Sequence, residues 1–123
     1  MAITTAGKNH VAGLIIGEAL TPFNAANAHI GVGDSATAFN VAQTDLVAAT
    51  NKMREPVDGA PTRNTNVLTF IATFDSGDAN WAWAEWGIFN GLSGNVMLSR
   101  KVASHGTKVA GDLWTMTADI TVG

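Results

Sequence analysis

A short tryptophan-rich run, residues 79–90, constrains the fold of this chain more than any other segment. It reads ANWAWAEWGIFN and holds three of the four tryptophans. Side chains alternate between the two faces of a strand, so a strand here places Trp81, Trp83, Glu85 and Phe89 on one face and Ala82, Ala84, Trp86 and Ile88 on the other. Both faces are apolar. We therefore expect the chain's own core to cover one face, and a second copy or a larger assembly to cover the other.

Length and charge narrow the class of protein. The 123 residues fit one domain, residues 1–123, and the absence of cysteine excludes disulfides and thiolate metal sites. The net charge of −3, with only 7 Lys and Arg scattered along the chain, argues against a nucleic-acid partner. Charged residues make up 14%, which is well below the usual quarter, and this shortage of surface charge favours association.

The sequence predicts neither a membrane span nor a secretory signal. The longest apolar stretch near the start, residues 11–17, is followed directly by Glu18 and is far shorter than the roughly 20 residues that span a bilayer. It also lacks the basic start and small-residue cleavage site of a signal peptide. We expect no membrane partner and a protein that stays in the cytoplasm where it is made.

The order of patterns predicts a mainly β fold. Residues 6–20 have helical spacing behind a Thr4 or Thr5 cap, and residues 1–5 are expected to form a flexible arm. Alternating apolar residues predict strands at 28–33, 52–57 (an edge strand, because Pro56 cannot donate), 67–74, 81–89, 96–102 and 113–122. The last four are expected to form an antiparallel meander. The predicted fold is an antiparallel β-sandwich or jelly-roll-like domain with one N-terminal α-helix.

Glu85 is the one candidate for a catalytic residue in this sequence. A carboxyl group among tryptophans has its charged form disfavoured and could act as a general acid. A glycosidase needs a second carboxylate, however, and only Asp119 in the last strand is a candidate. The favoured interpretation is structural, with Glu85 paired to Arg100 or Arg54 inside the fold or at a subunit boundary. The three histidines lack metal-ligand spacing. We expect no enzyme, no cofactor and no metal site.

The tryptophans also allow a different class of function. Trp81, Trp83, Trp86 and Trp114 could form a platform on which a sugar stacks, as in carbohydrate-binding modules. Tryptophan is equally favoured in buried interfaces, and the tyrosines that often surround a sugar platform are absent from this chain.

Several motifs, in their order along the chain, resemble virion proteins of tailed bacteriophages. They are an Asn-x-x-x-Gly-Leu helix (residues 9–14), HIGVGD (29–34), TDL (44–46), NVLTF (66–70) and EWGIFN (85–90). The resemblance covers most of the chain. It is strongest to the N-terminal domain of tail-collar fibre proteins, and it extends to small proteins encoded among phage head and tail genes.

The resemblance implies a structural protein of the virion. A fibre protein would continue into repeats or a receptor-binding tip, whereas this sequence ends at Gly123, so the first expectation is a capsid decoration (cement) protein. Such a protein would be a homo-oligomer, with a trimer favoured, bound to the major capsid protein. The alternative is a tail-collar or fibre-attachment component bound to tail or baseplate proteins. The residues expected at an interface are Trp81, Trp83, Glu85, Trp86, Phe89, Arg100 and Trp114.

Overall fold

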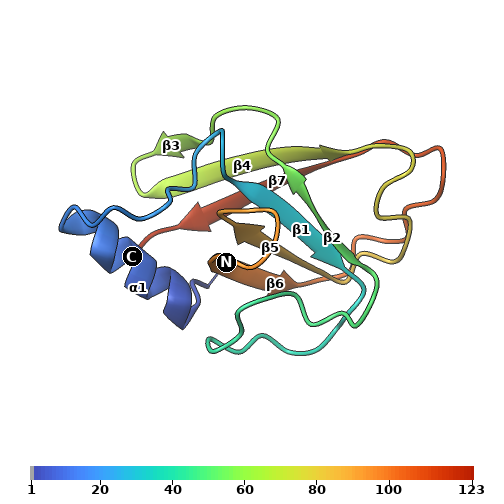
Figure 1. Ribbon diagram of the computed structural model, residues 1–123. Helices are drawn as coiled ribbons and strands as arrows, with labels where there is room; N and C mark the ends of the chain where they lie inside the picture. Colours follow the sequence, from blue (N-terminus) through green and yellow to red (C-terminus); the bar gives the residue numbers. More distant parts are fainter. Residues whose placement is uncertain (1) are drawn as a thin grey trace.

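Two antiparallel sheets packed face to face form this protein, with one helix at the N-terminal end. The computed structural model describes residues 2–123, and Figure 1 shows the helix beside one end of the sandwich. The predicted fold class, a mainly β sandwich with an N-terminal helix, is confirmed.

The elements follow the chain in the order α1, then β1 to β7. Their bounds are α1 Thr5–Ile15, β1 His29–Gly33, β2 Lys52–Pro56, β3 Thr62–Asn64, β4 Val67–Phe74, β5 Glu85–Phe89, β6 Met97–Val102 and β7 Trp114–Thr121. The four-stranded sheet has the order β2-β1-β5-β6 and the three-stranded sheet the order β3-β4-β7. The sequence did not predict β3, whose three residues carry no apolar alternation.

The helix is shorter than predicted. It begins after Thr4, whose side chain accepts a hydrogen bond from the Gly7 backbone N–H, as expected of a cap. It ends at Ile15 and not at residue 20, because Gly17 takes a left-handed conformation (φ 83°). The N–H groups of Gly17 and Glu18 then bond back to the carbonyls of residues 14 and 13, which closes the last turn.

Residues 2–5 do not form a free arm. Thr4 is fully buried; its backbone N–H donates to the Leu98 carbonyl (2.9 Å) and its hydroxyl to the Met97 carbonyl (2.6 Å). Ile3 bridges to Ser99 on the open side of β6. The N-terminal segment therefore extends the four-stranded sheet and anchors α1 against it. Met1, the first residue of the predicted arm, lies outside the described residues.

The predicted meander of the last four strands is wrong: β5 and β6 pair as consecutive neighbours, but β4 and β7 lie in the other sheet and pair with each other. β4 pairs along its whole length with β7, from Phe74 opposite Trp114 to Val67 opposite Thr121. β5 instead lies between β1 and β6. Local turn signals mark where strands end, but they do not specify which strands pair. Pairing depends on which faces must be buried together.

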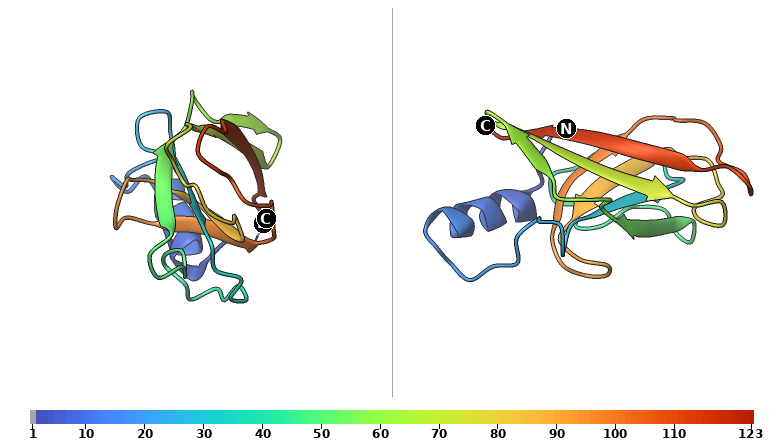
Figure 2. Two further views of the ribbon diagram at one scale, coloured as in Figure 1. Left: turned by 90° about the vertical axis from the view of Figure 1, so that its right-hand side faces the viewer. Right: turned by 90° about the horizontal axis from the view of Figure 1, so that it is seen from above.

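The core lies between the two sheets. Ile30 and Val32 from β1, Phe70 and Phe74 from β4 and Ile120 from β7 are each at most 1% exposed. β2 is an edge strand, as Pro56 predicted. Figure 2 shows the two layers end-on and from above, with α1 projecting beyond one end. The C-terminus lies near that end (Figure 1).

Candidate functional site

Glu85, at the start of β5, lies at the centre of a buried polar cluster. Its Oε1 accepts hydrogen bonds from Arg100 Nε (2.7 Å) and the Val47 N–H (2.8 Å). Its Oε2 accepts from the Ala48 N–H (2.8 Å) and the Ser35 N–H (3.3 Å). Both side chains of the Glu85–Arg100 ion pair are fully shielded from solvent. The predicted pairing of Glu85 with Arg100 is confirmed.

The cluster fixes a long connection, residues 34–51, onto the outer face of the four-stranded sheet. Arg100 completes it, since its Nη2 donates to the Thr37 carbonyl (2.9 Å) and its Nη1 to Gln43 Oε1 (3.1 Å). In Figure 1 this connection runs from the end of β1 to β2 along the lower side of the sheet. The sequence of residues 36–50 predicts an ordered connection, which is confirmed, and a brief helical turn at Thr44 and Asp45, which is absent. One ion pair thus holds a segment that has no regular secondary structure of its own.

Gly33 makes room for the carboxylate. It lies opposite Glu85 in the β1–β5 ladder, and a Cβ at this position would lie 2.5 Å from Glu85 Oε2. Any side chain here would force the carboxylate or the backbone to shift. The glycine of the HIGVGD motif therefore has a steric role in this cluster.

A small cluster of apolar side chains lies beside the ion pair on the same outer face. Phe89 and Met97 are fully buried and pack with Leu46 from the covering connection. The guanidinium of Arg54 lies over the Phe89 ring, 3.5 Å from its centroid. The sequence correctly predicted that both faces of β5 need cover. The cover of this face is the chain's own connection 34–51, not a second copy.

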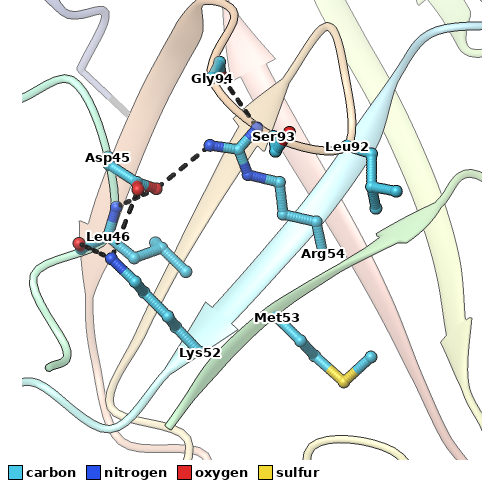
Figure 3. Close-up of a pocket in the computed structure, with 8 residues that line it drawn as sticks. All are labelled: Asp45, Leu46, Lys52, Met53, Arg54, Leu92, Ser93 and Gly94. Atoms are coloured by element: carbon cyan, nitrogen blue, oxygen red, sulfur yellow. Dashed lines mark hydrogen bonds and ion pairs between the residues drawn. The ribbon is translucent and has the colours of Figure 1, made fainter. Parts of the chain in front are cut away.

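A shallow hollow of about 210 Å³ opens at the rim of this face, between the connection 34–51 and the β5–β6 loop. Figure 3 shows Asp45 bonded to Arg54 Nη2 (3.2 Å) and Lys52 Nζ (3.4 Å). Burial raises the pKa of Asp45, but the Leu46 N–H, Arg54 and Lys52 outweigh it, and the pKa is lowered from its usual value. The two cations of this hollow are already paired within the chain.

Trp83 and Trp114 lie on the opposite, inner side of the four-stranded sheet. Trp83 is 2% exposed, donates from Nε1 to the Ala79 carbonyl (2.9 Å) and meets Phe74 edge to face. Trp114 packs against Trp83 with ring centroids 4.9 Å apart and stays half-buried. The alternation predicted Trp83 on the same face as Glu85, and this is wrong. The strand begins only at Glu85, because Ala79 has a positive φ of 53° and residues 79–84 are irregular.

Trp86 and Trp81 complete the tryptophan set. Trp86 is 7% exposed and packs against the ring of His105, with the two ring centroids 4.4 Å apart. Trp81 is half-buried. The indole Nε1 atoms of both are buried and find no hydrogen-bond acceptor among the described residues. The tryptophans therefore contribute mainly to the chain's own core.

The structure thus divides the seven predicted interface residues into two groups. Glu85, Phe89 and Arg100 lie under the connection 34–51, while the four tryptophans lie toward the space between the sheets. Five of the seven are buried in the monomer, and only Trp81 and Trp114 are partly open to solvent. The large apolar side chains that the structure leaves most exposed are instead aliphatic residues that were not among the seven.

These exposed aliphatic residues have no shared motif and could be found only from the fold. The most open are Ile15 and Ile16 at the end of α1 (both 78%), Leu92 (66%), Leu113 (64%) and Val109 (54%).

Two further polar features were missed by the sequence reasoning. Lys108 is fully buried, and its ammonium donates to the Asp75 carbonyl (2.6 Å) and Asn80 Oδ1 (2.9 Å). It ties the middle of the β6–β7 connection to the turn after β4. No motif marks a lysine of this kind, because its acceptors come from a distant turn.

Glu55 on β2 lies near three aspartates. Its pKa is raised from 4.5 to about 7, most by burial, then by the hydrogen bond with Asp78 and its negative charge, and less by the charges of Asp75 and Asp58. Within residues 2–123, no group of three or more His, Cys, Asp or Glu side chains is arranged to hold a metal ion. The acidic group is therefore a source of pH dependence for folding.

The geometry of Glu85 fits support of the fold. Its two carboxylate oxygens accept hydrogen bonds from four donors and have no contact with solvent. Asp119, the only candidate for a second carboxylate, accepts from Thr69 Oγ1 on the outer face of the other sheet. The two carboxylates therefore belong to different surfaces and do not face each other across a cleft.

Comparisons with known proteins add no relative to this picture. No protein-family model matches the chain, and no curated protein matches it. In the part of the chain that the structure describes, no helix has the length and apolar character to cross a membrane.

Proposed function

We propose that this protein is a non-enzymatic structural component of a tailed-bacteriophage virion, most simply a capsid decoration protein. The observation that carries the proposal is the set of water-exposed aliphatic side chains on a chain with only 14% charged residues. Ile15 and Ile16 at the end of α1, with Leu113 before β7, expose more than half of their surface. Apolar surface of this kind marks contact sites when many copies assemble.

The resemblance to phage proteins supports the same proposal. Three of its five motifs meet at Glu85: Gly33 of HIGVGD is opposite Glu85 of EWGIFN, and the segment after Asp45 of TDL donates two N–H groups to Glu85. Residues far apart in the chain therefore build one centre. The resemblance therefore includes the residues that hold this part of the fold together.

The proposed mechanism is mass action. A protein that binds the assembled shell and not its dissociated subunits stabilises the shell in proportion to the logarithm of its concentration. Each copy makes only modest apolar contacts, but symmetry repeats these contacts many times, so their contributions to the stability of the shell add up. A tail-collar role would use the same contacts in far fewer copies. The buried indoles of Trp83 and Trp86 offer no open platform for a sugar, which argues against the carbohydrate-binding alternative.

The test uses purified virions of the phage that encodes the chain. Mass spectrometry would give the copy number, and electron microscopy of particles from a deletion strain, with labelled protein added back, would give the position. A decoration protein is expected in about the number of capsid subunits or local symmetry axes, with label over the shell. Label confined to the tail supports the collar alternative. Absence from purified virions refutes the whole proposal.

The variants Ile15→Ser and Ile16→Ser test whether the exposed isoleucines contribute to binding, and Gly59→Ser is their matched control. The isoleucines are exposed and apolar, whereas residue 59 lies in open space on a turn. The isoleucine variants are expected to fold normally and to bind deletion particles more weakly. The glycine variant is expected to bind as the parent does.

A further inference from the structure

The free edge of β7 differs from every other sheet edge of this protein. β2 is short and carries Lys52 and Pro56, and β3 has only three residues. The open side of β6 is covered by residues 2–4. β7 has eight residues in unbroken register with β4 and carries no lysine, proline or bulge. Exposed edges without such features are ready to pair with another strand.

The register identifies which backbone groups are unpaired. The Val122 N–H donates to the Asn66 carbonyl (2.8 Å), which continues the β4–β7 ladder by one residue. Hydrogen-bonded pairs alternate in an antiparallel ladder, so the even-numbered residues of β7 bond to β4. The N–H and C=O groups of Thr115, Thr117, Asp119 and Thr121 therefore point away from β4. Among residues 2–123, no other strand pairs with β7.

We propose that β7 pairs antiparallel with β7 of a second copy, about a two-fold axis at Ala118. The ladder with β4 runs from Trp114 to residue 122, and Ala118 is the middle of this span. The pair joins two three-stranded sheets into one continuous sheet. Thr115 lies opposite Thr121 of the other copy, and Thr117 opposite Asp119. All the unpaired groups then form hydrogen bonds, about eight in total.

The side chains of β7 suit this pairing with itself. Opposite residues in an antiparallel pair share a face. With the axis at Ala118, inward Met116 meets inward Ile120, and outward Thr117 meets Asp119. The single charge of the strand is thus placed opposite a hydroxyl, as it already is within the monomer, where Thr69 Oγ1 donates to Asp119 Oδ1 (2.6 Å). Moving the axis by one residue to Asp119 would place two carboxylates opposite each other, which is unfavourable.

Hollows lie at both ends of this edge. One of about 500 Å³ is lined by Trp83, Leu113, Trp114 and Met116, among others. The other, of about 470 Å³, lies between α1 and the end of β7 and includes Ile15 and Val122. The two-fold axis brings Leu113 and Trp114 of one copy beside Val122 of the other, at the rim of the second hollow. The contact therefore adds apolar burial to the backbone hydrogen bonds.

This pairing does not depend on the proposed virion function, and it differs from the trimer that the resemblance implies. A two-fold contact uses the same surface on both copies and closes at two. The isolated protein is therefore expected to be a dimer. Sedimentation of the full chain at micromolar to about 100 µM concentration would measure this directly.

Thr117→Glu and Thr117→Lys form a matched pair of variants for the test. Residue 117 is exposed, so both are expected to fold. Glutamate places two like-charge contacts with Asp119 across the axis and is expected to raise the dimer dissociation constant about tenfold. Lysine places two opposite-charge contacts there and is expected to leave the constant unchanged or lower it. Equal weakening by both variants would overturn the proposal.

Cross-linking tests the register. The chain has no cysteine, so introduced thiols react only with one another. A mixture of Thr117→Cys and Asp119→Cys proteins is expected to form a disulfide-linked heterodimer on oxidation, since opposite backbone positions lie within disulfide reach. Thr69→Cys, on the same face but on the central strand, is the control and is expected to stay unlinked. A monomer or a trimer in sedimentation, or no more cross-linking than the control, would refute β7 pairing.

Discussion

Removal of the Glu85 carboxylate is expected to detach the connection 34–51 from the sheet. In Glu85→Ala, Arg100 keeps only its bonds to Gln43 and Thr37, and its charge remains buried without a counter-ion. The N–H groups of Ser35, Val47 and Ala48 lose their acceptor as well. The change therefore leaves one buried cation and several buried donors unsatisfied.

The expected loss in the free energy of unfolding is about 3–5 kcal/mol, the usual cost of removing one partner of a buried ion pair. The stranded N–H groups would add to it if the connection stayed in place, at about 1–3 kcal/mol each. Local release of the connection is cheaper, so we expect the segment to detach first. A domain of this size has about 5–15 kcal/mol of stability in total. The variant is therefore expected to fold, but marginally.

The measurements are urea unfolding followed by tryptophan fluorescence, and amide hydrogen exchange. The Val47 and Ala48 amides should be protected in the parent protein and should exchange rapidly in the variant. Arg100→Met is expected to cost a similar amount. The double variant should cost clearly less than the sum of the two, because it leaves no lone charge.

Asp45→Ala is the control, because Asp45 is half-exposed in its ion pairs and its loss should cost no more than about 1 kcal/mol. A Glu85→Ala variant within about 1 kcal/mol of the parent, with Val47 and Ala48 still protected, would show that the ion pair does not hold the connection.

Two further predictions concern pH and steric fit. Because the folded-state pKa of Glu55 is raised from 4.5 to about 7, the fold favours its protonated form, and stability should fall as pH rises across that window. Glu55→Gln should flatten this dependence and stabilise the protein above pH 7 by of order 1 kcal/mol, after allowance for solvent screening of a partly exposed group; an unchanged pH profile of urea midpoints would contradict this. Gly33→Ala, whose Cβ would lie 2.5 Å from Glu85 Oε2, should cost about 1–3 kcal/mol, whereas Gly59→Ala, with open space around it, should change the midpoint little.

Alternation of apolar residues was enough to predict most strands. β4 was predicted with its observed bounds, and β1, β2, β6 and β7 within one residue at each end. These segments carry their signal locally, because one face of each meets the core and the pattern of period two is a direct consequence. The Thr4 cap followed from the same kind of local chemistry. The pairing of Glu85 with Arg100 followed from the high cost of burying a charge without a partner.

Other features depended on contacts between distant parts of the chain. The sequence could not show that residues 34–51 fold back over Phe89 and Glu85, because this segment is irregular and its N–H donors carry no residue signature. It could not show that β4 pairs with β7 and not with β5, since a turn signal does not name the next partner.

The sequence by itself determined that the chain forms a charge-poor β domain, in which the strand within the tryptophan-rich run must be covered on both sides. Only the tertiary structure decided what covers it: the opposite sheet on one side and the connection 34–51 on the other. The physical reason is that the need to bury an apolar face is a local property of its side chains. Which surface meets that need depends on the path of the whole chain.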